Sequence, residues 1–241
     1  MNRYGLLTKR FLAARKLGFN FFGTSRTKLP QHVKFGSKVV PLVYPSDEGY
    51  MSDIINLWLD DEYGLRQRGG DPSTIVDVGA NIGLFSLWAR YFYPEANITA
   101  IEPNPRVYHE CCKNLANSNV KVLNVGISQR EGRAMMDDTG NSRNASTVPM
   151  SDGDIHLMPL SSILEELGGS IDLLKMDCEG FEWDIFSDSK AFEGIGEIRM
   201  EYHLGSSHTI ESLKCITHDL GYRMTHCNPN QGFGIAWFEK R

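Results

Sequence analysis

A chain of 241 residues with 41% hydrophobic and 10% aromatic residues can bury a substantial core, which excludes an intrinsically disordered protein. The formal net charge is -5, yet residues 1–46 carry nine basic residues and no acidic one, so the remainder has a net charge of -14. An acidic main part excludes binding of a nucleic-acid backbone by that part. The basic start of the chain is a candidate contact for a membrane surface or another anionic partner.

The cysteine content and the lengths of the apolar runs indicate the cellular compartment of the protein. Five cysteines without paired spacing indicate neither a disulfide framework nor a thiolate zinc site. There is no run of about 18 apolar residues and no signal-peptide core. We therefore expect a cytoplasmic protein, peripheral to the membrane if the basic segment binds there.

Residues 1–70 are predicted to form an N-terminal basic extension and cap, and residues 71–241 a single core domain. In a helix over residues 3–18, one apolar face would be formed by Tyr4, Leu7, Phe11 and Ala14. Such a helix either binds a membrane surface or partner, or packs on the domain with a solvated basic face. We favour packing on the domain. One or two short strands follow within residues 32–44, and a further helical pattern begins near Gly49.

From Thr74 onward, strand-like and helix-like patterns alternate, which is typical of an α/β fold. We predict a doubly wound, mostly parallel seven-stranded sheet whose last two strands form a C-terminal antiparallel hairpin, with one reversed strand at its end. The segment 129–146 is polar and contains glycine, so it is either a hairpin or a loop. After the strand that begins at Thr74, the expected strands are residues 98–101, 120–125, 171–176, 197–202, 222–227 and 233–239.

The turn after the first core strand is the strongest candidate for a ligand site. Asp77 is followed by Gly79 and Gly83, and a helical pattern then begins. A nicotinamide dinucleotide site would need a different glycine spacing, and a carboxylate in the turn would repel its pyrophosphate. Asp77 instead suits a cationic ligand with an amino acid end, such as S-adenosylmethionine. Glu102, at the next strand end, is placed to accept the hydroxyl protons of a ribose.

Three segments, Val76–Gly83, Ile101–Asn104 and Leu174–Glu182, resemble the signature segments of FkbM-type methyltransferases. That family belongs to the class I S-adenosylmethionine-dependent enzymes, so the resemblance implies a Rossmann-like fold and methyl transfer to a hydroxyl, often of a sugar or a natural product. It implies a small-molecule or glycan acceptor. It also implies a set of cofactor-binding residues: Asp77, Gly79, Ala80, Asn81, Gly83, Glu102, Gly126 and Asp177.

A hydroxyl acceptor needs a base close to the methyl group. Candidates at the strand ends are Asp177, Glu179, Glu182, Glu201 and His203. We expect His203 to be the base, because an unperturbed imidazole titrates near neutral pH. Asp177 and Glu179 complete the expected catalytic set. The alternative is a histidine that only hydrogen-bonds the sheet edge.

The same cluster of acids and a histidine can ligate a divalent metal ion. Clustered carboxylates at a site for a cationic ligand have another explanation, so no metal is expected and this alternative is not favoured. Two other functions remain open from the residues: a methyltransferase-like protein that binds without turnover and, less favoured, a nicotinamide-dependent oxidoreductase.

Overall fold

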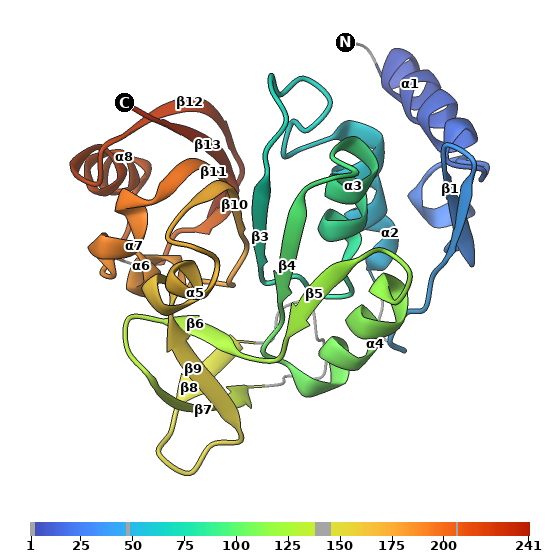
Figure 1. Cartoon of the computed structure of the whole chain (residues 1–241). Helices are drawn as coiled ribbons and strands as arrows, with labels where there is room; N and C mark the ends of the chain where they lie inside the picture. The colour runs from blue at the N-terminus through green and yellow to red at the C-terminus, as the bar shows by residue number, and fades with distance from the viewer. Residues whose placement is uncertain (1–2, 47–48, 138–145, 206) are drawn as a thin grey trace.

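The computed structural model describes residues 3–46, 49–137, 146–205 and 207–241 (Figure 1). Its centre is a seven-stranded sheet, parallel except for one strand, which confirms the predicted doubly wound α/β fold. In spatial order its strands are β12 (Tyr222–Pro229), β13 (Phe233–Lys240), β11 (Ile195–His203), β10 (Ile171–Met176), β3 (Thr74–Val78), β4 (Asn97–Ile101) and β5 (Val120–Leu123).

The C-terminal hairpin is confirmed, but the reversed strand is not at the end of the sheet. β13 pairs antiparallel with both β11 and β12, so it lies between them and β12 forms the edge. Since β12 precedes β13 in the chain, the chain reaches the edge of the sheet first and then returns inward. The alternation of apolar residues predicts strands but carries no information on this order.

Each face of the sheet is covered by helices and has its own hydrophobic core. One core joins the sheet to the N-terminal elements and to the helices α3 (Leu84–Phe92) and α4 (Pro105–Leu115). The other core joins it to the later helices, which lie on the opposite side in Figure 1. These are α5 (Leu160–Glu166), α6 (Glu182–Ile185), α7 (Ser189–Glu193) and α8 (Ile210–Asp219).

The N-terminal elements pack on the core domain. They are α1 (Arg3–Lys16), a 3₁₀ turn η1 (Thr24–Arg26), the hairpin of β1 (His32–Phe35) and β2 (Lys38–Pro41), α2 (Tyr50–Ile54) and a π-helix η2 (Ile55–Asp60). Ala14 of α1 and Val33 of β1 are buried in the same core as α3. The boundary between an extension of residues 1–70 and a core of residues 71–241 stays a prediction.

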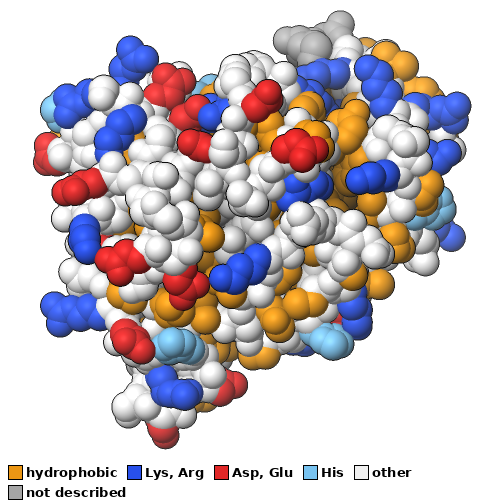
Figure 2. Space-filling model, in the orientation of Figure 1, with side chains coloured by type: hydrophobic (Ala, Val, Ile, Leu, Met, Phe, Trp, Pro, Cys, Tyr) orange, Lys and Arg blue, Asp and Glu red, His pale blue; other side chains and the backbone are white. Residues whose placement is uncertain are grey.

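Helix α1 packs on the domain, with the basic side exposed. Arg10 forms an ion pair with Asp60 of η2, and Ala14 is fully buried. Tyr4 is 81% exposed, so the apolar face predicted for this helix is only partly covered. Lys and Arg side chains gather over these elements, at the upper right of Figure 2. None of the helices in the described ranges combines the length and the apolar character that crossing a membrane requires.

A second, four-stranded sheet follows β5 and was not predicted as a sheet. Its strands lie in the order β6 (Gly126–Ser128), β9 (Ile155–Pro159), β7 (Gly132–Asp137) and β8 (Ser146–Pro149). The antiparallel pairing of β7 with β8 agrees with the hairpin alternative for segment 129–146, of which residues 138–145 lie outside the described part. Figure 1 shows this sheet at the end of the molecule away from the C-terminal hairpin.

Candidate active site

The polar residues of the candidate site project from three neighbouring strands. β3 lies beside β10 with Asp77 in register with Lys175, and β10 lies beside β11. Side chains alternate between the two faces of a strand, so residues two apart share a face. Asp177 therefore lies on the side of Lys175, and Glu201 and His203 project to that same side of the sheet, which the N-terminal elements cover.

The turn after β3 runs so close to β10 that only glycine fits at its first position. Gly79 has φ 70°, and a Cβ atom there would lie 1.7 Å from the carbonyl oxygen of Asp177. The backbone N–H groups of Gly79 and Ala80 both donate to the carbonyl of Ile101, at 3.0 and 2.9 Å. The turn is thereby anchored to β4 as well, and its next residue, Asn81, also has a positive φ.

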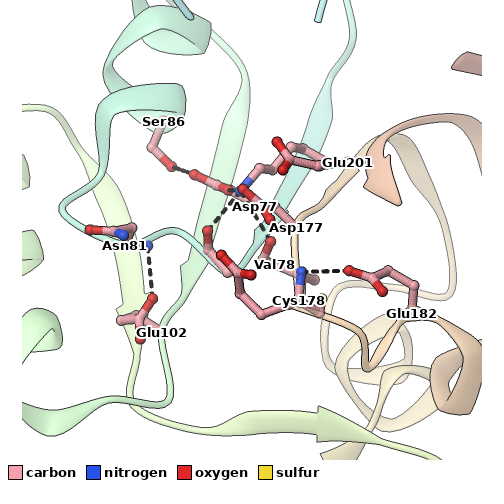
Figure 3. Close-up of polar contacts among 12 residues, drawn as sticks. Asp77, Val78, Asn81, Ser86, Glu102, Asp177, Cys178, Glu182 and Glu201 are labelled. Atoms are coloured by element: carbon pink, nitrogen blue, oxygen red, sulfur yellow. Dashed lines mark hydrogen bonds and ion pairs between the residues drawn. The ribbon is translucent and has the colours of Figure 1, made fainter. Parts of the chain in front are cut away.

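The carboxylate of Asp77 is held inside the protein. Its Oδ2 accepts a hydrogen bond from the Ser86 hydroxyl at 2.7 Å (Figure 3), and its Oδ1 lies 3.2 Å from Nζ of Lys175. Asp77 is 0% exposed, and Lys175 also donates to the carbonyl of Gly79 at 2.7 Å. Lys175 therefore balances the charge of Asp77 inside the protein, and the expected contact of Asp77 with a cationic cofactor stays a prediction.

Glu102 connects the turn to the end of β4. One of its carboxylate oxygens accepts a hydrogen bond from the backbone N–H of Asn81 at 2.8 Å (Figure 3), and the other accepts one from the backbone N–H of Asn104 at 2.8 Å. Burial raises the pKa of Glu102 to about 7, although these two hydrogen bonds act in the opposite direction. Glu102 therefore fixes the conformation of the turn, and its expected contact with a ribose stays a prediction.

Two further glycines expected to bind cofactor have evident packing roles. Gly83 precedes α3 with φ 84°, and a Cβ atom there would lie 2.9 Å from the side chain of Leu115. Gly126 begins β6, where a Cβ atom would lie 2.7 Å from the side chain of Leu157. The positive φ of Gly83 favours glycine there, whereas at Gly126 the end of the Leu157 side chain could shift to admit a Cβ atom. The expected contacts of both residues with the cofactor stay predictions.

A cavity of about 500 Å³ opens beside the turn, at the carboxyl ends of β3, β10 and β11. The end of a parallel strand array is where α/β proteins bind ligands. Of the expected site residues, Gly79, Ala80, Asn81, Asp177, Glu179 and His203 line it, whereas Asp77, Gly83, Glu102 and Gly126 do not. The described N-terminal cap supplies residues that the sequence did not point to: Ser52, Asp53, Asn56, Leu57, Glu62 and Tyr63.

His203 is surrounded by carboxylates. Its Nδ1 lies 3.1 Å from Oε1 of Glu182, and its Nε2 lies 3.4 Å from Glu201 and 3.5 Å from Glu179. Burial lowers the pKa of His203, but the hydrogen bonds to Glu182 and Glu201 outweigh it and raise the pKa to about 11. The premise that His203 titrates near neutral pH is therefore wrong, because the imidazole is protonated there and has no lone pair to accept a proton.

The pKa of Asp177 is also raised, but it lies closer to neutral pH than that of His203. Burial, together with the negative charges of Glu201 and Glu179, raises its pKa to about 8, although Lys175 acts to lower it. Its Oδ1 is a buried atom without a hydrogen-bond partner among the described residues. A carboxylate with this pKa is a stronger base than an ordinary aspartate.

Glu182 organises the loop between β10 and α6. It is fully buried, and its Oε1 accepts hydrogen bonds from the backbone N–H groups of Cys178 at 3.0 Å and Gly180 at 3.3 Å, as well as contacting His203. Figure 3 shows the bond to Cys178. Glu182 was one of five base candidates, and its burial makes it a support for His203 rather than a group in the cavity.

Asp177, Glu201 and His203 are also the residues that can hold a metal ion. One ligand atom from each lies within 4.8 Å of the others, and this is the only such cluster found in the described ranges. Mixed carboxylate and imidazole ligands suit several divalent ions. In the arrangement described here, however, the protonated imidazole already supplies a positive charge among these carboxylates.

The sequence matches the family model described as "Methyltransferase FkbM domain" over residues 77–224, which is more than half of the chain. Methyltransferase sdnD of Sordaria araneosa is 31% identical over 186 residues, covering 60% of this chain and 71% of that protein. Methyltransferase 1 of Beauveria bassiana (strain ARSEF 2860) is 26% identical over 143 residues, covering 48% and 57% of the two chains.

Solved structures with a similar chain path include precorrin-6y C5,15-methyltransferase from Geobacter metallireducens GS-15. It matches 76% of this chain and 87% of its own, with 14% sequence identity and a TM-score of 0.48.

Proposed function

Because the chain belongs to the FkbM family of methyltransferases, we propose that it transfers a methyl group from S-adenosylmethionine to a hydroxyl oxygen of a carbohydrate or secondary metabolite. The observation that carries this proposal is the cavity at the strand ends. It brings a backbone turn of the kind that binds cofactors together with Asp177, a carboxylate whose pKa is raised to about 8.

The cofactor fits the residues present. The backbone of the turn, Gly79 to Asn81, lines the cavity, and the lack of a side chain at Gly79 lets this turn lie against Asp177. The described cavity wall has more carboxylates than cationic groups, which suits a ligand with sulfonium and ammonium groups. We assign the turn and Asp177 to the cofactor, and Asp77 and Glu102 to holding the turn in place.

When bound, the cofactor would supply an electrophilic methyl group on a positively charged sulfur. The residues of the chain have separate tasks. Asp177 in its ionised form accepts the proton of the acceptor hydroxyl. The imidazolium of His203, held by Glu182, balances the charge of the surrounding carboxylates. The cap residues Glu62 and Tyr63 close one wall of the cavity, so that a bound acceptor is positioned for in-line attack.

Measurements of ligand binding and of turnover distinguish the proposed methyltransferase from two alternative functions. A protein that binds without turnover would take up S-adenosylhomocysteine but methylate no hydroxyl compound. A nicotinamide-dependent oxidoreductase would bind NAD. The neutralised Asp77 weakens one argument against NAD, but the family membership weighs against that alternative.

The experiment combines calorimetry with a transfer assay. The purified protein is titrated with S-adenosylhomocysteine and with NAD, and then incubated with methyl-labelled S-adenosylmethionine and a panel of glycosides, polyketide alcohols and nucleotide sugars. We expect binding of S-adenosylhomocysteine but not of NAD, and label in an O-methyl ether. Tight binding of NAD alone, or label on nitrogen or carbon only, would overturn the proposal.

The basic N-terminal elements support a second, separate proposal about partners. The exposed basic side of α1 suits an anionic surface, such as the headgroups of a membrane. The packing of Ala14 into the core and the ion pair of Arg10 with Asp60 indicate that such contact would be made by the folded domain, not by a detached helix.

A further inference from the structure

A second cavity lies between α1 and α3, and we call it the α1–α3 cavity. Its volume is about 410 Å³, which is in the size range of small-molecule sites. Residues of α1, β1, η2 and α3 line it, and none of its lining residues also lines the cavity at the strand ends. The proposed methyl transfer therefore does not account for the α1–α3 cavity.

The described wall of the α1–α3 cavity has four cationic side chains and no carboxylate. These are Lys9, Lys16, Lys34 and Arg66. Lys9 and Lys16 are about two turns apart on α1, so they share one face of this helix. Within the ranges that the structure describes, none of the three lysines is in an ion pair. The neighbouring carboxylate of Asp60 is paired with Arg10 instead.

Arg66 is fixed in this wall by the backbone of η2. Its guanidinium group donates to the carbonyls of Trp58 and Leu59, the latter at 3.2 Å, and lies 4.9 Å from the ring centroid of Trp88. Asp61 is buried, and its carboxylate accepts hydrogen bonds from Nε1 of Trp88 and the backbone N–H of Arg66. Because Asp61 partly balances Arg66, the three lysines supply most of the attraction for an anion.

The rest of the wall is apolar and largely aromatic. The rings of Trp88 and Tyr91 stack with centroids 5.6 Å apart, and Phe92 meets Trp88 edge-on at 4.8 Å. Leu12 is 55% exposed and Tyr91 is 44% exposed, so part of this apolar wall is open to solvent. Figure 2 shows Lys and Arg side chains next to apolar ones in this part of the molecule, at the upper right.

A membrane lipid uses both halves of this wall, whereas a soluble phosphate uses only one. A free phosphate would pair with the lysines and leave the exposed side chains of Leu12 and Tyr91 in water. An anionic phospholipid offers its phosphate to the lysines and the beginning of its acyl chains to these two side chains. Lysine stems can lie along apolar surface while the ammonium groups reach the phosphate. The combination of charge and exposed apolar surface therefore favours the lipid.

We propose that the α1–α3 cavity binds the headgroup of an anionic phospholipid. Lys9, Lys16 and Lys34 pair with its phosphate, and Leu12 and Tyr91 contact the start of its acyl chains. This inference rests on the proposed contact of the basic N-terminal elements with an anionic surface, and it gives that contact a site and a class of lipid. Because the two cavities share no lining residue, lipid binding leaves the strand-end cavity free for the cofactor and acceptor.

The first test measures the site with soluble ligands. The full-length protein is titrated in a calorimeter with dihexanoyl phosphatidate below its micelle concentration, with dihexanoyl phosphatidylcholine and with glycerol 3-phosphate. We expect one phosphatidate per chain, bound at least about tenfold more tightly than either other ligand, since each of these lacks the anionic charge or the apolar chains. Equal affinity for glycerol 3-phosphate would indicate a site for free phosphate, and equal affinity for phosphatidylcholine would indicate apolar binding alone; either result would overturn the proposal.

A matched pair of variants separates the cavity from the general basic surface. Lys34 and Lys38 are exposed lysines of the same hairpin, but only Lys34 lines the cavity. Lys34→Gln should weaken phosphatidate binding about fivefold, and Lys38→Gln by less than about twofold. The double variant Lys9→Gln with Lys16→Gln should weaken it by about tenfold or more. Equal losses in Lys34→Gln and Lys38→Gln would assign the binding to diffuse surface charge and contradict the site.

Co-sedimentation with vesicles separates this proposal from the wider one. Phosphatidylcholine vesicles with added phosphatidate should bind the protein, and Lys34→Gln should bind them severalfold less than Lys38→Gln. Vesicle binding that is equal in the two variants would overturn the site but keep the membrane contact, and no binding to anionic vesicles would end both. Methyl transfer to a soluble acceptor should be unchanged in Lys34→Gln, which shows that the loss is not one of folding.

Discussion

Nζ of Lys175 lies 3.2 Å from Oδ1 of Asp77, across two adjacent strands in parallel register, and both side chains are buried. The same ammonium group donates to the carbonyl of Gly79 in the turn. This pair therefore links the centre of the sheet to the conformation of the proposed cofactor turn.

Replacing Lys175 with methionine should destabilise the protein by about 3 kcal/mol or more, because it leaves the buried charge of Asp77 without a partner. The measurement is the free energy of unfolding in urea, together with the affinity for S-adenosylhomocysteine, which should also fall. The double variant Lys175→Met with Asp77→Asn removes both charges and should recover most of the stability. If the double variant is as unstable as the single one, the ion pair is not the cause.

Replacing Asp177 with asparagine should lower kcat by about 100-fold or more, the usual contribution of a positioned base. The side chain keeps its size, so the protein should stay folded and retain S-adenosylhomocysteine binding within about tenfold. Steady-state kinetics and calorimetry check this. Glu166→Gln, which alters an exposed pair with Lys121, serves as the control and should behave as the wild type. Turnover close to wild type in Asp177→Asn would exclude Asp177 as the base.

The pH dependence of kcat/KM should report the titration of Asp177. Since its pKa is raised to about 8 and the base acts when ionised, kcat/KM should rise about tenfold per pH unit below pH 8 and level off above it. Glu62 also lines the cavity and its pKa is raised to about 9, so Glu62→Gln should keep the same rise of kcat/KM with pH. If the rise of kcat/KM with pH disappears in Glu62→Gln, the titrating group is Glu62 and not Asp177.

The stabilising effect of His203 should depend on pH. Its pKa is about 11 in the folded protein and about 6.5 unfolded, so its charged contacts stabilise the protein fully below pH 6.5 and progressively less as pH rises toward 11. His203→Gln should cost about 2 kcal/mol at pH 6, typical of a hydrogen bond to a charged group, and less at pH 10. Urea unfolding at both values checks this. A cost that grows with pH would show that the imidazole is neutral in the folded state.

Methyl transfer should survive thorough treatment with EDTA. A divalent ion at Asp177, Glu201 and His203 would first have to displace the proton from an imidazole whose pKa is raised to about 11. The assay compares activity before and after chelation, with Mg²⁺ and Mn²⁺ added back. Loss of activity that either ion restores would establish a metal-dependent reaction.

Periodicity and local motifs predict where the strands lie in the sequence. They do not predict which strands pair with one another, or which side chains come into contact. The apolar alternation of β3 and β10 and the glycine spacing after Asp77 lead directly to the turn and to Asp177. The pairing of Asp77 with Lys175 was missed, although a lysine within an apolar strand is itself a signal, because a buried ammonium requires a partner. The error on His203 has a similar origin, since Glu182 and Glu201 shift its pKa through contacts that only the fold creates.

The cap could not be placed from the sequence. Asp53 and Glu62 lie more than 110 residues before Asp177 in the chain, and no repeat or spacing relates them. One helix start also differs from its local sequence pattern. Ser162 begins a capping-box pattern, yet α5 begins at Leu160 and has no side-chain cap, because β9 leads straight into it.

The 1.7 Å approach between a Cβ atom at position 79 and the carbonyl of Asp177 has a consequence for how this enzyme can diversify. Because the two backbones are in contact, no residue larger than glycine fits at position 79. Glu62 and Phe233 belong to segments that do not form this contact and lie at opposite ends of the chain. Substitutions in the cap and in the C-terminal hairpin can therefore reshape the cavity while the turn keeps its backbone conformation.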